Sequence, residues 1–137
     1  MRVQDLKIGE RVLSYDPITA KFFENKVTNI GVTNTSSILN IDNGLLYVSG
    51  LRDRPIYAQL PNGTAEWIMV GNLTTFDHIL NPLDGSWVPV SSIQTLTGNF
   101  TVYEINGKKM FYQDGHMRFT YLANGILLDK KTCVTCV

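Results

Sequence analysis

Few residues in this sequence are of types that could carry out covalent or metal chemistry. His78 and His116 are the two histidines, and Cys133 and Cys136 are the two cysteines. Their Cys-x-x-Cys spacing is typical of zinc sites and thiol redox pairs. However, a zinc site needs two more ligands, and a redox pair normally opens a helix that lowers the thiolate pKa. Neither is predicted here. We interpret the cysteines as unpaired or joined in a terminal disulfide, with metal binding as the lesser alternative, and we predict no cofactor.

The composition indicates one folded domain. The 137 residues are 44% hydrophobic, and twelve basic residues balance twelve acidic ones. With no net positive charge to attract phosphates, nucleic acid and anionic membranes are not expected as main partners. No apolar run reaches the ~18 residues of a membrane span, and residues 1–5 lack the apolar stretch of a secretory signal. We expect a soluble domain, cut from a longer chain.

Four Asn-x-Ser/Thr sequons begin at Asn34, Asn62, Asn72 and Asn99. Such an excess is a mild indication of an extracellular or cell-surface location. An abundance of β-turn residues is the more ordinary explanation, so the localisation stays open.

The apolar pattern predicts an all-β fold, because the runs are short, β-branched or aromatic, and separated by turn residues. Asn43-Gly44 and Asn62-Gly63 predict hairpin turns, since Asn-Gly tolerates positive φ. Single helical turns are expected only after Val3 and Val70. The predicted strands cover 11–15, 26–32, 37–41, 45–48, 55–60, 65–70, 78–80, 87–94, 100–105, 109–112 and 119–122. The predicted core is Leu6, Val12, Leu13, Val27, Ile38, Ile41, Ile56, Trp67, Leu73, Ile79, Val90, Val102, Ile105, Tyr121 and Ile126.

An internal repeat runs through the chain. Residues 3–13 align with 70–80, 27–30 with 90–93, 38–44 with 102–107, 54–57 with 118–121, and 62–63 with 124–125. Because the order is kept throughout, the repeat predicts two copies of a β unit related by a pseudo-twofold axis. Leu13 and Leu80, Ile41 and Ile105, and Tyr57 and Tyr121 should then occupy equivalent positions.

Four motifs resemble those of one family. They are D-L-K-I-G-E-R-V-L-S-Y-D at 5–16, W-I-M-V-G-N-L at 67–73, T-V-Y-E-I at 101–105 and A-N-G-I-L-L at 123–128. On these motifs, residues 3 to about 130 resemble the Hint superfamily, the Hedgehog/intein autoprocessing fold. The resemblance implies a duplicated all-β fold of the Hint type, with a domain over 1–130 and a C-terminal tail over 131–137.

The chemistry of that family is peptide-bond rearrangement. A Cys or Ser at the first residue attacks its own preceding carbonyl, a Thr-x-x-His loop activates the amide, and a closing His-Asn pair releases the C-terminal partner. Such chemistry needs a nucleophile and a proton carrier in one pocket. The resemblance therefore supplies specific positions at which this sequence can be compared with an active member.

Most of those positions carry the wrong residue. The chain opens on Met1, and the family's opening strand is expected to be missing before Val3. Arg54 stands at the position of the activating histidine, and arginine does not exchange protons near neutrality. Asp129-Lys130 stands in place of the closing His-Asn, and lysine cannot cyclise as asparagine does.

Weak remnants of the family's chemical residues are Glu104, which keeps the acidic character, and His116, which lies about three residues before the expected histidine. A turn histidine is the more ordinary interpretation of His116. In the same comparison, Thr132 or Cys133 lies near the place of an acceptor nucleophile, which makes a vestigial junction a third interpretation of the cysteine segment.

We therefore predict an intein-like domain that has lost self-splicing and acts as a non-catalytic module of a larger protein, with the flanking segments of its parent polypeptide as its partners. One alternative is an autoprocessing domain whose N-terminal nucleophile segment is missing from this chain. Another is an unrelated β-rich binding module with similar turns. A Cys or Ser opening a strand upstream of Met1 in the parent polypeptide would favour the first alternative.

Overall fold

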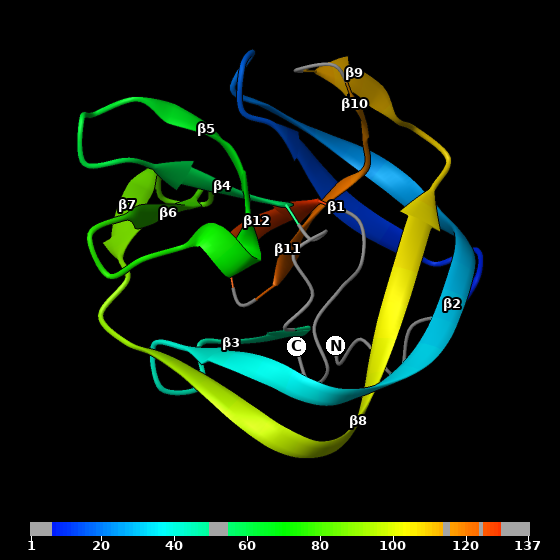
Figure 1. The fold of residues 1–137 in the computed structure, drawn as a ribbon. Helices are drawn as coiled ribbons and strands as arrows, with labels where there is room; N and C mark the ends of the chain where they lie inside the picture. The colour runs from blue at the N-terminus through cyan, green and yellow to red at the C-terminus, as the bar shows by residue number, and fades with distance from the viewer. Residues whose placement is uncertain (1–6, 50–54, 114–115, 124, 130–137) are drawn as a thin grey trace.

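The computed structural model describes residues 7–49, 55–113, 116–123 and 125–129. These residues form an all-β body (Figure 1). The strands are β1 (Arg11–Asp16), β2 (Lys21–Ile41), β3 (Leu46–Ser49), β4 (Pro55–Gln59), β5 (Ala65–Met69), β6 (His78–Asn81), β7 (Ser86–Pro89), β8 (Ile93–Gly107), β9 (Phe111–Gln113), β10 (His116–Arg118), β11 (Thr120–Ala123) and β12 (Ile126–Asp129), and a 3-10 turn, η2 (Val70–Asn72), follows β5.

Two long strands dominate the architecture. β2 and β8 pair antiparallel over most of their length and curve together around one side of the body (Figure 1). The pairing register shifts between Val27 and Asn29 and again between Thr35 and Ser37. Each shift bends the strand, because an extra residue on one side of a ladder increases the local twist. β1 and β3 also pair with β2 and complete this sheet.

A second sheet fills the concave side of the curved pair. Its order is β11-β12-β4-β6-β7, with β5 also paired to β4. β9 and β10 form a separate hairpin. β12 lies between β11 and β4, and all four of its residues are buried. The closing strand is therefore enclosed by the fold.

The core lies between the two sheets, and most of the predicted core residues are in it. Ile41, Ile56, Ile79, Ile105 and Ile126 are each at most 1% exposed. Leu73, Val90 and Tyr121 belong to the same cluster, and Val27, Ile38 and Val102 are also buried. Val12 packs partly buried against that cluster, and Trp67 packs against a second cluster of Tyr57, Leu80 and Leu127. Leu6 lies outside the described residues.

Leu13 is the one described residue of the predicted core that is exposed, at 42%. Side chains alternate along a strand, and Ser14 takes the inward position of β1. The hydroxyl of Ser14 donates a hydrogen bond of 2.7 Å to the carbonyl oxygen of Thr120. A polar contact between β1 and β11 therefore sets which face of β1 is buried.

The turns predicted at Asn43-Gly44, at Asn62-Gly63 and after Val70 are confirmed, but several strand boundaries were wrong. The helical turn predicted after Val3 lies outside the described residues. Asp42, Asn43 and Gly44 all have positive φ and join β2 to β3. β4 and β5 form the hairpin at Asn62-Gly63, and the helical turn after Val70 is η2. The strands predicted over 26–32 and 37–41 are parts of β2, which starts at Lys21. The strand predicted over 87–94 is interrupted at 90–92, where Asp42 accepts hydrogen bonds from the Ser91 and Ser92 N–H groups.

The structure leaves the twofold equivalence as a prediction. Ile41 and Ile105 are both buried, as are Tyr57 and Tyr121. Leu80 is 8% exposed, whereas its predicted partner Leu13 is largely exposed, so that pair does not share an environment. No helix in the described part of the chain is long and apolar enough to span a membrane.

Candidate functional site

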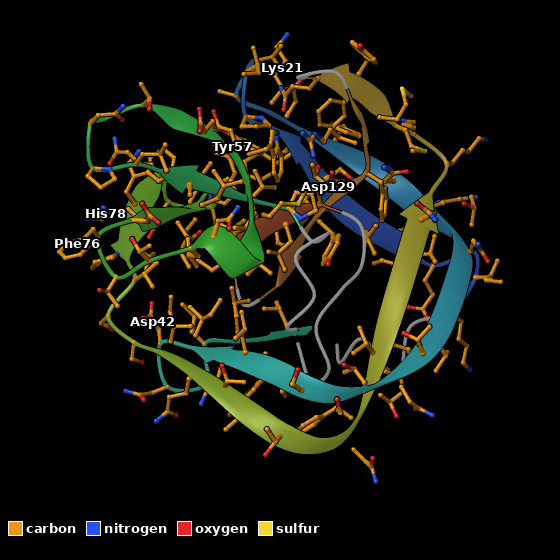
Figure 2. All side chains as sticks on the ribbon, in the orientation of Figure 1. Lys21, Asp42, Tyr57, Phe76, His78 and Asp129 are labelled. Carbon is orange, nitrogen blue, oxygen red and sulfur yellow. The ribbon has the colours of Figure 1, made fainter. Side chains whose placement is uncertain are left out.

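The candidate site lies at the end of β12, where the A-N-G-I-L-L motif leads into Asp129. Asp129 is 2% exposed and lies in the interior of the body (Figure 2). One carboxylate oxygen, Oδ2, is 2.9 Å from Nη1 of Arg118. The other, Oδ1, accepts a hydrogen bond of 2.9 Å from the Phe119 N–H. Both oxygens of this buried carboxylate therefore have partners on the β10–β11 segment.

The local fold explains how Arg118 and Asp129 meet. β11 and β12 form a hairpin in which Thr120 is paired with Asp129. Arg118 ends β10, two residues before Thr120, so its side chain can reach the carboxylate across the hairpin. Gly125 has a φ of 81° in the connecting turn, a conformation that glycine adopts without strain.

An aromatic ring completes the surroundings of Arg118. The guanidinium carbon lies 5.0 Å from the centre of the Trp67 ring, a distance at which the ring face attracts a cation. The Nε of Arg118 is buried without a hydrogen-bond partner among the described residues. The indole N–H of Trp67 donates a hydrogen bond to the side-chain carbonyl of Gln113, whose amide donates to Asp16 at 3.3 Å. Polar contacts thus extend from β12 to the first hairpin.

A second buried network joins β11 to the β1–β2 hairpin. Oγ1 of Thr120 donates to the carbonyl oxygen of Tyr15 and accepts from the Tyr15 N–H. The side-chain amide of Asn25, which is 2% exposed, donates to Oγ of Ser14 and to the carbonyl oxygen of Lys109. These contacts connect the β1–β2 hairpin to β11 and to the segment that carries Lys109.

Phe119 fills the space beside the ion pair. It is fully buried, and a Cβ added at Gly107 would overlap its ring. The ring therefore packs directly against the backbone at the end of β8. The resemblance places the family's histidine about three residues after His116, which is at Phe119, a residue that cannot carry a proton.

The arrangement can hold strands together, but it is poorly suited to proton transfer. Arginine does not release protons near neutrality, and both oxygens of the Asp129 carboxylate are already engaged by Arg118 and the Phe119 N–H. Removing one partner of a buried ion pair is strongly destabilising, at roughly 3–5 kcal/mol, because it leaves an uncompensated charge. The Arg118–Asp129 pair therefore fixes the closing strand in place.

The other residues predicted for the site are only partly described. Glu104 lies on β8 opposite Gly31, and His116 lies on β10 opposite Gln113; their side chains are outside the described set. Arg54, Lys130, Thr132 and Cys133 also lie outside the described residues. His78 is half-buried on β6. No three His, Cys, Asp or Glu side chains gather as metal ligands within the described part of the chain.

Sequence reasoning singled out Asp129 but missed its partners. Arg118 appeared only as a position in the repeat, and Trp67 only as a core residue and as the first residue of the 67–73 motif. A usable signal was present, because an aspartate that follows three apolar residues at the end of a buried strand needs a cation or several N–H donors. The register of the β11–β12 hairpin then makes Arg118, which lies two residues before Thr120, a candidate for that cation.

Comparisons with known proteins identify the fold. No protein-family model matches the sequence, and no curated protein does. Among solved structures, the chain is similar to a bacterial intein-like domain from Clostridium thermocellum, with a TM-score of 0.67 and 20% identity over 96% of this chain and 85% of that one.

The chain is also similar to a DnaB intein from Synechocystis sp. PCC 6803, with a TM-score of 0.64 and 19% identity over 90% of this chain and 80% of that one. A third match is the Ssp DnaB mini-intein variant M86, with a TM-score of 0.62 and 19% identity over 91% and 78% of the two chains. The predicted all-β, Hint-like fold is confirmed.

Proposed function

We propose that this chain is an intein-like domain that no longer splices and serves as a non-catalytic module of a larger polypeptide. The observation that carries the proposal is the Arg118–Asp129 pair. Asp129 stands where the resemblance places the penultimate histidine, and both of its oxygens are engaged by Arg118 and the Phe119 N–H. A proton carrier at this position has been exchanged for a fixed internal ion pair.

Three further positions in the sequence support the same function. Lys130 stands where asparagine would cyclise, and an ammonium group cannot attack the chain's own carbonyl as a carboxamide does. Phe119 stands where the resemblance expects the preceding histidine. Arg54 stands where a histidine would activate the scissile amide. Losses of catalytic groups that act as a unit leave only the background of the scaffold.

A module of this kind would present its flanking segments from a rigid body. β12, which leads to the C-terminal segment, is enclosed between β11 and β4 and fixed by a buried ion pair. Under this proposal, the domain serves as a stable spacer or docking unit. β12, the strand that leads to the C-terminal segment, stays paired in the sheet.

The test is to place the chain between two inert folded domains and follow the intact mass at neutral pH with and without a thiol. We expect the full mass to persist for days, whereas the DnaB mini-intein in the same fusion should splice. Arg54→His alone should change nothing. Thiol-accelerated fragments at either junction would overturn the proposal and favour an active autoprocessing domain.

A further inference from the structure

A small cleft beside the β1–β2 hairpin gathers an unusual share of the positive charge. Its volume is about 230 Å³, and it is lined by Arg11, Glu24, Asn25, Lys26, Lys108 and Lys109. The whole chain has twelve basic and twelve acidic residues. Four of those basic residues line this cleft against one acidic residue, which gives a local charge of 4 − 1 = +3.

The fold brings these cations together against their mutual repulsion. Arg11 is directly opposite Lys26 in the β1–β2 pairing. The Lys108 N–H donates a hydrogen bond of 2.9 Å to the carbonyl oxygen of Lys26, so the two lysines are adjacent across strands. Like charges directly opposite one another on a sheet are destabilising. A cluster of this kind therefore lowers stability until a counter-charge binds.

A buried side chain holds the two lysine-bearing segments at this spacing. Oδ1 of Asn25 accepts hydrogen bonds of 2.9 Å from both the Lys26 and Lys109 N–H groups. Nδ2 of the same residue donates to the Lys109 carbonyl oxygen at 2.8 Å. The backbone that carries Lys26, Lys108 and Lys109 is thus fixed around the floor of the cleft before any ligand arrives.

Glu24 is the one acidic side chain of the cleft. It forms an ion pair of 2.9 Å with Arg11, and both side chains are more than 60% exposed. An exposed pair of this kind contributes little, so Arg11 is easily drawn to another anion. The three lysines have no ion pair with any of the described acidic residues.

We propose that this cleft binds a small multivalent oxyanion, a phosphate or sulfate group that is free or carried on another molecule. Lysine recognises such groups as a point charge, and arginine can do so with two N–H groups. The volume admits one or two tetrahedral groups, and the local charge complements them. An acidic peptide would have to be accommodated outside this small space.

The test is an amide NMR titration of the whole chain with sodium pyrophosphate, with sulfate and a hexaglutamate peptide as parallel ligands at constant ionic strength. We expect saturable shifts at the amides of Lys26, Lys108 and Lys109. Equal affinity for sulfate would assign the cleft to tetrahedral oxyanions in general, and tighter binding of pyrophosphate would assign it to oxyanions of higher charge. The shifts should weaken in 0.5 M salt, since exposed charges are screened.

Two variants that should change the pyrophosphate affinity in opposite directions make the test specific. Lys26→Gln combined with Lys108→Gln should weaken pyrophosphate binding by about tenfold, because two of the charges are lost. Glu24→Gln should tighten binding by about threefold, because a repulsive carboxylate is lost and Arg11 is released. Lys21→Gln, at the far end of the β1–β2 hairpin (Figure 2), should leave binding unchanged.

Three outcomes would overturn the proposal. They are the absence of saturable shifts with any oxyanion, an equal effect of all the variants, and binding of the hexaglutamate peptide alone. Because Lys26, Lys108, Glu24 and Lys21 are exposed, these substitutions should not prevent folding. A thermal shift on adding pyrophosphate, expected at about 2–4 °C near saturation, gives a second readout.

Discussion

The molecule holds its positive charge in two contrasting ways. At the end of β12, one arginine is buried, and Asp129 and the Trp67 ring compensate its charge. At the cleft beside the β1–β2 hairpin, four exposed cations line the same space as one carboxylate, Glu24, which pairs with Arg11. In the first region the cation is enclosed and paired with a carboxylate, and in the second most of the cations are open to solvent and have no ion pair among the described residues.

The difference indicates which region is suited to binding a ligand and which to stabilising the fold. A buried pair is costly to break because water cannot replace the lost partner. An exposed cluster of like charges lowers the free energy of unfolding modestly, and a bound anion can reverse this loss. Under the proposed function, the position that the resemblance assigns to catalysis has a structural role, and the open charge lies elsewhere on the fold.

The largest expected effect comes from breaking the enclosed region. Arg118→Met should lower the free energy of unfolding by about 3–5 kcal/mol, because Asp129 would remain buried without the cation that balances its charge. Urea denaturation followed by tryptophan fluorescence measures the loss.

Two controls separate the charge effect from lost packing. Arg118→Met combined with Asp129→Leu should recover most of the stability, since an apolar pair of similar volume is often neutral or stabilising. Arg11→Gln, which removes the exposed pair with Glu24, should change stability by less than about 1 kcal/mol. If Arg118→Met proved as mild as Arg11→Gln, the buried pair would not be what holds β12.

Removing a charge from the open region should have the opposite effect on the free energy of unfolding. Without any multivalent anion, Lys26→Gln should raise the free energy of unfolding by about 0.2–1 kcal/mol, because the residue directly opposite Arg11 loses its charge. The gain should shrink in 0.5 M sodium chloride. Denaturation in low and high salt, with Lys21→Gln as the matched control, measures it. A loss of stability would mean that the cations of the cleft do not repel one another.

The structural features that could be predicted correctly from the sequence are local ones. Asn43-Gly44 and Asn62-Gly63 form turns because their conformational preference depends on the residues themselves. The length of β2 was missed because its continuity depends on pairing with β8, which includes two register shifts. Leu13 was misplaced because the inward position of β1 is set by a hydrogen bond from Ser14 to a distant strand.

The same distinction holds for the candidate site. Asp129 was found through a motif, but its partner Arg118 depends on the β11–β12 register and on Trp67 from β5. The cleft was not predicted, because a balanced total charge conceals a local excess. Lys26 and Lys108 become neighbours only through a backbone hydrogen bond between segments far apart in the sequence.

The smallest expected effect concerns a lone exposed carboxylate, which belongs to neither region. Asp84, in the β6–β7 turn, accepts hydrogen bonds from the hydroxyl and the N–H of Ser86. The hydroxyl contact chiefly, with the N–H contact, lowers the pKa of Asp84 below its ordinary value. Since the folded-state pKa is the lower one, the stabilisation is present above the unfolded pKa and is lost as the pH falls through the folded pKa.

Ser86→Ala should therefore raise the pKa of Asp84 towards its ordinary value. It should also remove part of the stabilisation that the ionised carboxylate contributes above its unfolded pKa, without changing the fold. A carbon-13 NMR titration of the Asp84 carboxyl from pH 7 to pH 2 measures the shift. Thr64→Ala, which removes a turn hydroxyl bonded to Asn62 in the β4–β5 hairpin, should leave the Asp84 titration unchanged. Because Asp84 is exposed on a turn, water and the remaining N–H bond compensate most of the loss. An unchanged Asp84 pKa in Ser86→Ala would show that the hydroxyl contact does not persist in solution. Isolated surface contacts would then contribute even less to stability, in comparison with the enclosed Arg118–Asp129 pair.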